Sequence, residues 1–131
     1  MADNETVKMI ADYMENGFLE NIIDMFRHDL SLFSHLPEVM ADERSRVRIG
    51  FVNLVETFLQ EYPQEIRSTV PGIAGLLKNE KPELRADAAY MLEIIGDKRA
   101  LSAIESAYNE ENVEPVRQVL GDVIQTMKAR M

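Results

Sequence analysis

The chain has 131 residues, of which 46% are hydrophobic, and it carries no cysteine and a formal charge of −9. This length suits one domain with a core of its own, and the missing cysteines exclude disulfides, thiolate nucleophiles and thiolate zinc sites. The balance of 23 Asp and Glu against 14 Lys and Arg argues against a nucleic-acid partner, because the global field repels phosphate.

Targeting signals are not evident in the sequence. The N-terminal residues, Met-Ala-Asp-Asn-Glu, are acidic and lack the apolar region of a signal peptide. The longest apolar run covers residues 70–77 and is far too short for a membrane span. We therefore expect a cytoplasmic protein with no membrane partner.

Helical periodicity runs through the whole chain, and no hairpin-turn pattern competes with it. A first helix is predicted over residues 4–16, and helical spacing continues over residues 18–40, where Pro37 kinks the segment or opens a new helix. Further helices are predicted over residues 45–60, 64–78, 83–95, 98–109 and 114–128. The sequence therefore predicts an all-α fold.

An internal repeat organises these helices. In three segments a helix ends, a short polar turn follows, and the next helix begins with an apolar residue followed by Arg48, Arg85 or Arg117. These arginines are 37 and 32 residues apart, a period that indicates stacked helix pairs, because one pair cannot bury its apolar face alone. Alignment of the repeats predicts a buried core of Val52, Val55, Phe58, Ile73, Leu76, Leu77, Ala88, Ala89, Leu92, Ile95, Ile104, Leu120 and Ile124.

The stretch from Leu76 to Leu101 resembles a HEAT repeat. Within it, Ile95-Gly96-Asp97-Lys98-Arg99-Ala100 resembles the short HEAT-like repeat also found in phycobilisome lyases. The resemblance implies a short right-handed α-solenoid of about three helix pairs, in a single domain over residues 1–131. Its parts would be an N-terminal helical cap, residues 1–28, and repeats over residues 29–60, 64–96 and 97–130.

The resemblance also implies a ladder of polar side chains. In HEAT families an acidic or amide residue in the turn often pairs with the repeated arginine. The matching pairs in this chain are Asp42 with Arg48, Asn79 with Arg85, and Glu111 with Arg117. Recognition of a phosphate or carboxylate by the arginines is the alternative, since guanidinium groups bind such anions bidentately.

Groups suited to catalysis or metal binding are sparse. Asp24, His28 and His35 share about one helix face, but a solvated polar face accounts for them, so we predict no metal site. No nucleophile elbow or phosphate-binding loop is present, and the adjacent Glu110 and Glu111 fit a solvated turn. The sequence therefore predicts no enzyme activity and no cofactor.

A binding surface is the strongest functional expectation. In stacked helix pairs the second helix of each pair lines the concave side, which is the usual binding face of solenoids. Alignment places two rows of residues there, one of Asn53, Tyr90 and Asp122 and one of Glu56, Glu93 and Gln125. Tyrosine is enriched at interface hot spots and the carboxylates suit a basic or polar partner, although an ordinary solvated surface has a similar composition.

Two functions are compatible with these features. The favoured one is a non-catalytic protein-interaction module that acts as an adaptor, regulatory subunit or assembly scaffold. The alternative is a bilin lyase or isomerase-like subunit, which the phycobilisome-lyase-type repeat implies. Val119 and Val123 lie outside the aligned core of the last helix, so we expect this end to dock onto a second copy of the chain or another protein, with ordinary exposed valines as the alternative.

Overall fold

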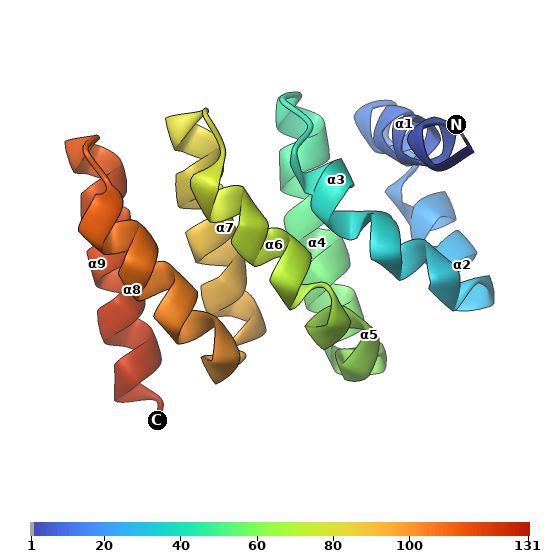
Figure 1. Ribbon diagram of the computed structural model, residues 1–131. Coiled ribbons are helices and arrows are strands. Elements are labelled where there is room, and N and C mark those ends of the chain that lie inside the picture. The colour runs from blue at the N-terminus through green and yellow to red at the C-terminus, as the bar shows by residue number, and fades with distance from the viewer. Residues whose placement is uncertain (1) are drawn as a thin grey trace. The chain divides into compact units, whose positions relative to one another are not determined.

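The computed structural model describes residues 2–131, and these residues form helices and no strands (Figure 1). The predicted all-α fold is therefore confirmed. The chain divides into two compact units, a first unit that ends at Thr69 and a second unit that begins at Val70. Each unit combines short helices with longer ones.

The first unit contains five α-helices and a short 3₁₀ helix. In chain order they are α1 (Ala2–Glu15), α2 (Leu19–His28), the 3₁₀ helix Leu30–His35, α3 (Leu36–Met40), α4 (Ser45–Glu61) and α5 (Pro63–Ser68). The predicted run over residues 18–40 is divided at Asp29, whose backbone is extended and whose carboxylate accepts a hydrogen bond from the N–H of Ser31 at 3.1 Å. Pro37 then lies in the first turn of α3, where its missing N–H leaves no helical hydrogen bond unmade.

Aromatic rings form the centre of the first unit's core. Phe26 of α2, Phe33 of the 3₁₀ helix and Phe58 of α4 are fully buried. Their ring centroids lie 5.0 to 5.7 Å apart, in edge-to-face and stacked arrangements that stabilise beyond the area they bury. The N-terminal helices therefore share one core with α4.

The second unit consists of α6 (Val70–Gly75), the 3₁₀ helix Leu76–Lys78, α7 (Pro82–Ile95), the 3₁₀ helix Lys98–Ala100, α8 (Leu101–Glu110) and α9 (Glu114–Ala129). Pro82 and Pro115 occupy the first turns of α7 and α9. Gly96 ends α7 in the left-handed conformation, with φ 74°, which a residue with a side chain rarely adopts. Helices α7 and α9 pack side by side, and α8 packs against α9 (Figure 1).

A glycine in the middle of α9 allows the close approach of α8. A Cβ atom at Gly121 would lie 3.2 Å from Cε1 of Tyr108, which is tighter than ordinary van der Waals contact. The guanidinium of Arg117 lies 4.2 Å from the centroid of the same ring, in cation–π geometry. Tyr108 therefore fixes the packing of α8 on α9 through two contacts.

Most of the predicted core is buried. The residues found buried are Val55, Phe58, Ile73, Leu77, Ala88, Ala89, Leu92, Ile95, Ile104 and Leu120. Val52, Leu76 and Ile124 are half-buried, because they lie at the edges of the buried faces.

The prediction that Val119 and Val123 are both exposed on α9 is wrong. Val123 is 0% exposed and Val119 is half-buried. Because α7 and α8 both pack against α9, the buried side of this helix is rotated toward Val123. The buried residues of α9 are Val116, Leu120, Val123 and Met127.

Candidate functional site

In the first unit, the residues predicted to bind a partner lie on the exposed side of α4. Asn53 and Glu56 are both exposed. They belong to a shallow hollow of about 380 Å³, lined by Asn53, Glu56, Thr57, Gln60 and Glu61. Arg27 of α2 donates to both carboxylate oxygens of Glu61, at 2.9 and 2.7 Å, and this hydrogen bonding lowers the pKa of Glu61. Glu56 has no such partner among the described residues.

In the second unit, the predicted residues lie on two adjacent helices. Tyr90 of α7 is 49% exposed, and Asp122 and Gln125 of α9 are exposed. Glu93 of α7 is half-buried, and its backbone carbonyl accepts a hydrogen bond from Nη1 of Arg130 at 3.1 Å. Because α7 and α9 pack together, the structure places these four residues on neighbouring helices of one unit.

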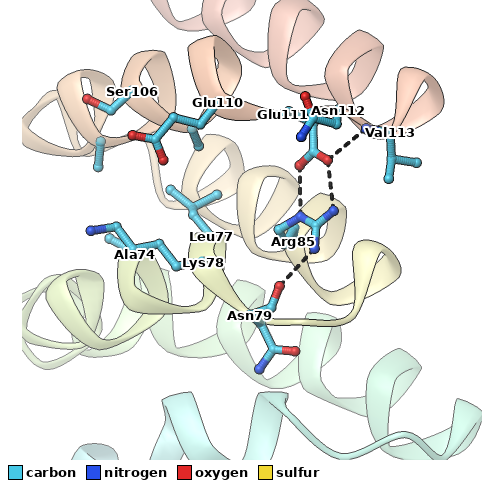
Figure 2. A pocket seen from close by; sticks show the side chains of 12 residues that line it. Ala74, Leu77, Lys78, Asn79, Arg85, Ser106, Glu110, Glu111, Asn112 and Val113 are labelled. Atoms are coloured by element: carbon cyan, nitrogen blue, oxygen red, sulfur yellow. Dashed lines mark hydrogen bonds and ion pairs between the residues drawn. The ribbon is translucent and has the colours of Figure 1, made fainter.

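The repeated arginine of α7 joins two turns of the second unit (Figure 2). Nε and Nη2 of Arg85 donate to the two carboxylate oxygens of Glu111, at 2.8 and 2.7 Å, and Nη1 donates to the carbonyl of Asn79 at 2.9 Å. The Arg85 and Glu111 side chains are only 17% and 4% exposed. The expected contact of Arg85 with Asn79 is therefore present, but it uses the backbone carbonyl, while the side-chain Oδ1 accepts from the N–H of Lys81 at 3.0 Å.

Electrostatics make Glu111 a structural anion. The hydrogen bonds from Arg85 lower the pKa of Glu111, and the N–H of Val113, 3.1 Å from Oε2, acts in the same direction against the opposing effect of burial. The same ion pair raises the pKa of Arg85. A general acid at neutral pH needs a raised pKa, so this carboxylate is unsuited to donate a proton.

The ladder predicted from the sequence is partly wrong. Glu111 pairs with Arg85 rather than with Arg117, because the guanidinium of Arg117 lies over the Tyr108 ring. The pairing of Asp42 with Arg48 stays a prediction.

A local motif that the sequence reasoning missed holds Asp42. Asp42 accepts hydrogen bonds from Nε and Nη2 of Arg44 at 3.0 and 2.9 Å, and Nη1 of Arg44 reaches Asp12 of α1 at 3.0 Å. The same Asp-X-Arg arrangement recurs at Asp97 and Arg99, and in both turns the Asp also accepts the backbone N–H of the Arg. The repetition of Asp-X-Arg before a helix was the available signal.

A groove of about 730 Å³ lies between α8 and the segment of α6 and the following 3₁₀ helix, and the Arg85–Glu111 pair is part of its lining (Figure 2). Small and apolar side chains line it, namely Ala74, Leu77, Ala103, Ala107 and Val113. Lys78, Ser106 and Glu110 add polar groups. The groove therefore offers mainly small and apolar side chains for contact, with a few polar groups beside them.

The described part of the chain holds neither a metal-binding cluster nor a membrane-spanning helix. No three His, Cys, Asp or Glu side chains gather there as metal ligands would. Nδ1 of His28 lies 2.8 Å from the carbonyl of Asp24, within its own helix. None of the helices in this range is both long and apolar enough to cross a bilayer.

The chain folds as helices paired across tight turns, and its longer helices have exposed polar faces. These features define a helical-repeat protein. Comparison with protein families matches residues 33–125 to HEAT repeats. The match covers most of the chain, and the chain belongs to the HEAT-repeat proteins. Helices α1 and α2 precede the matched segment, and the match does not single out the phycobilisome-lyase type. Comparisons with curated proteins and with solved structures gave no match.

Proposed function

We propose that the chain is a non-catalytic, cytoplasmic protein-interaction module, used as an adaptor, regulatory subunit or assembly scaffold. It binds a partner protein through exposed helix faces, that of α4 in the first unit or those of α7 and α9 in the second unit. HEAT repeats generally mediate contacts between proteins, through the surfaces that stacked helices create.

The observation that carries this proposal is the exposure of Tyr90. Tyr90 is 49% exposed on α7, beside a helix that exposes Asp122 and Gln125. Tyrosine supplies a large contact area with few rotatable bonds and is enriched at interface hot spots. The Asp122 and Gln125 side chains have no hydrogen bond or ion pair among the described residues, so they are free to meet polar groups of a partner.

The carboxylates with shifted pKa values favour binding over catalysis. Four carboxylates have a shifted pKa, namely Asp12, Asp42, Glu61 and Glu111. In each the pKa is lowered by side-chain hydrogen bonds, from Lys8 and Arg44 for Asp12 and from a single arginine for the others. Acid–base catalysis requires a carboxyl group whose pKa is raised toward neutrality, which is the opposite shift.

Affinity capture with matched surface variants tests the proposal. The wild-type chain should capture a defined partner from its source cells, and Tyr90→Ala and Asp122→Lys should each reduce the captured amount about tenfold, as expected for hot-spot residues. Glu110→Lys makes the same change of charge as Asp122→Lys but lies in the groove beside α8. Capture should persist in that control. Equal capture by all the variants, or a loss in the control alone, would refute binding through α7 and α9.

A further inference from the structure

The exposed side of α4 combines an apolar side chain with an unpaired carboxylate. Ile49 is 67% exposed, which is a large exposed fraction for an isoleucine. Glu56 follows seven residues later on nearly the same face, about 10 Å further along the helix axis. A single exposed aliphatic side chain is ordinary on a protein surface, so its surroundings decide whether it has a function.

The turn between α1 and α2 adds apolar surface near Ile49. Phe18 is 51% exposed and Tyr13 is 42% exposed, and their ring centroids lie 5.9 Å apart. Leu19, the neighbour of Phe18, packs at Gly50, the neighbour of Ile49, where a Cβ atom would lie 3.9 Å from Cδ1 of Leu19. The exposed apolar residues Tyr13, Phe18 and Ile49 therefore belong to one region of the first unit, which we call the apolar end of α4.

The opposite end of this face is the hollow that contains Glu56, which we call the acidic hollow. Of its two carboxylates, Glu61 is neutralised by the bidentate ion pair with Arg27. Glu56 is exposed and has no hydrogen-bond or ion-pair partner among the described residues. Glu56 is therefore the charge in the acidic hollow that a partner can still neutralise.

The net charge of the first unit favours a cationic partner. Residues 1–69 contain 13 acidic and 6 basic residues, whereas residues 70–131 contain 10 and 8. Among the basic residues of the first unit, Lys8, Arg27 and Arg44 are already engaged in ion pairs with carboxylates of the same unit. Arg46 and Arg48 lie near Ile49 at the start of α4, so the negative charge on this helix is concentrated at the end that carries Glu56. A strongly negative surface accelerates association with cationic partners and disfavours anionic ones.

We propose that the α4 face is a docking site for a cationic amphipathic helix of a partner protein. Its apolar side chains contact the apolar end of α4, and a Lys or Arg enters the acidic hollow and pairs with Glu56. This inference rests on the proposed function and names the chemistry of the partner.

Ile49 and Glu56 are the two residues that would anchor a partner, and their spacing favours a helix over an extended peptide. On an α-helix, residues seven apart share a face and lie about 10 Å apart, which matches the separation of Ile49 and Glu56. In an extended strand the residues on one face are separated by even numbers, which gives spacings of about 7 or 13 Å. Neither of these spacings matches the two anchors. Insertion of an amphipathic helix along a helical surface is a common mode of peptide recognition.

A designed peptide provides the probe. It is a fluorescent, amidated helix with leucines and lysines seven residues apart on one face, and its control has the same composition in shuffled order. Fluorescence anisotropy with the full chain at low salt should show saturable binding that is about tenfold tighter for the helix than for the shuffled peptide. Binding should weaken as salt is added, because the charges are exposed. Equal affinity for both peptides, or no binding, overturns the inference.

Matched variants locate the probe on α4. Ile49→Ser and Glu56→Lys should each weaken binding of the helical peptide about tenfold. The controls are Leu30→Ser, which truncates another exposed apolar side chain of the first unit, and Glu38→Lys, which makes the same charge change on α3. These controls should change affinity less than about twofold. Equal losses in the test variants and their controls would show that binding does not depend on this face of α4 and would refute the site.

The outcome is separable from that of the proposed function. If partner capture depends on Tyr90 and Asp122 but peptide binding is unchanged by the Ile49 and Glu56 variants, only the α4 docking site is refuted. If peptide binding depends on Ile49 and Glu56 but no α7 or α9 variant affects partner capture, the result supports α4 docking and refutes the proposed role of α7 and α9.

Discussion

Two neighbouring glutamates at the end of α8 have opposite roles. Glu111 is buried and holds Arg85 with two hydrogen bonds, whereas Glu110 is exposed and has no partner among the described residues. The sequence presents them as an equivalent pair. Their difference arises because the chain turns at this point and directs only one of them toward α7. The contact joins residues 26 positions apart, so no local pattern indicates it.

The Arg85–Glu111 pair makes stability depend on pH. The pKa of Glu111 is lowered in the folded chain, so its contribution is complete above the ordinary glutamate value of 4.5 and is lost as the pH falls through the folded value. At pH 7, Glu111→Ala should reduce the free energy of unfolding by about 2–3 kcal/mol, because it leaves a partly buried arginine unpaired. Urea unfolding at several pH values should show this difference shrinking below about pH 4.5.

The neighbouring residue supplies the control for this experiment. Glu110→Ala removes a carboxylate of the same type from an exposed position and should change the unfolding free energy by less than about 0.5 kcal/mol at any of these pH values. A constant effect of Glu111→Ala from pH 7 to pH 3 would mean that its carboxylate contributes packing rather than charge.

Among the elements, the long helices were predicted best. The predicted ranges 45–60, 83–95 and 114–128 lie within one residue of the observed ends of α4, α7 and α9. Each shows clear apolar periodicity, and prolines in the first turns of α5, α7 and α9 mark where those helices begin.

The predicted helix over residues 64–78 was the least accurate. It is divided into α5, α6 and a 3₁₀ helix. The hydroxyl of Thr69 donates to the carbonyl of Ile66 at 2.6 Å, and Pro71 has no N–H to continue the helical ladder. Apolar periodicity persists through this break, because consecutive short helices can still turn the same side toward the core. Periodicity alone therefore could not locate it.

A small residue in α7 sets its packing. Ala89 is 0% exposed, so a larger side chain has no space without displacing its neighbours. Ala89→Leu should lower the free energy of unfolding by about 1–3 kcal/mol through overpacking. Ala86→Leu, in the same helix at a half-buried position, is the control and should have less effect. Thermal unfolding measures both variants, and equal melting temperatures for Ala89→Leu and the wild type would refute this account of the packing.

Across the whole molecule, the sequence predicted which residues lie on the surface better than it predicted the exact buried face of each helix. Alignment of the repeats placed Asn53, Tyr90 and Asp122 outside the core, and all three are exposed. It misjudged α9, because residues spaced by three and four positions fit two neighbouring helix faces equally well. Only the packing of both α7 and α8 against α9 selects the face that includes Val123.

The burial of Val123 changes the expectation for self-association through the last helix. Val123→Glu would place a charge in the core and unfold the chain, so it cannot test an interface. Val119 is half-buried, and Val119→Glu is the suitable probe. Because little apolar surface remains on this side of α9 and the chain carries a charge of −9, we expect copies to repel one another and the chain to sediment as a monomer. Sedimentation velocity of the wild type and Val119→Glu over a wide concentration range should give the same monomer. A wild-type dimer that Val119→Glu dissociates would instead assign this helix to a homodimer interface.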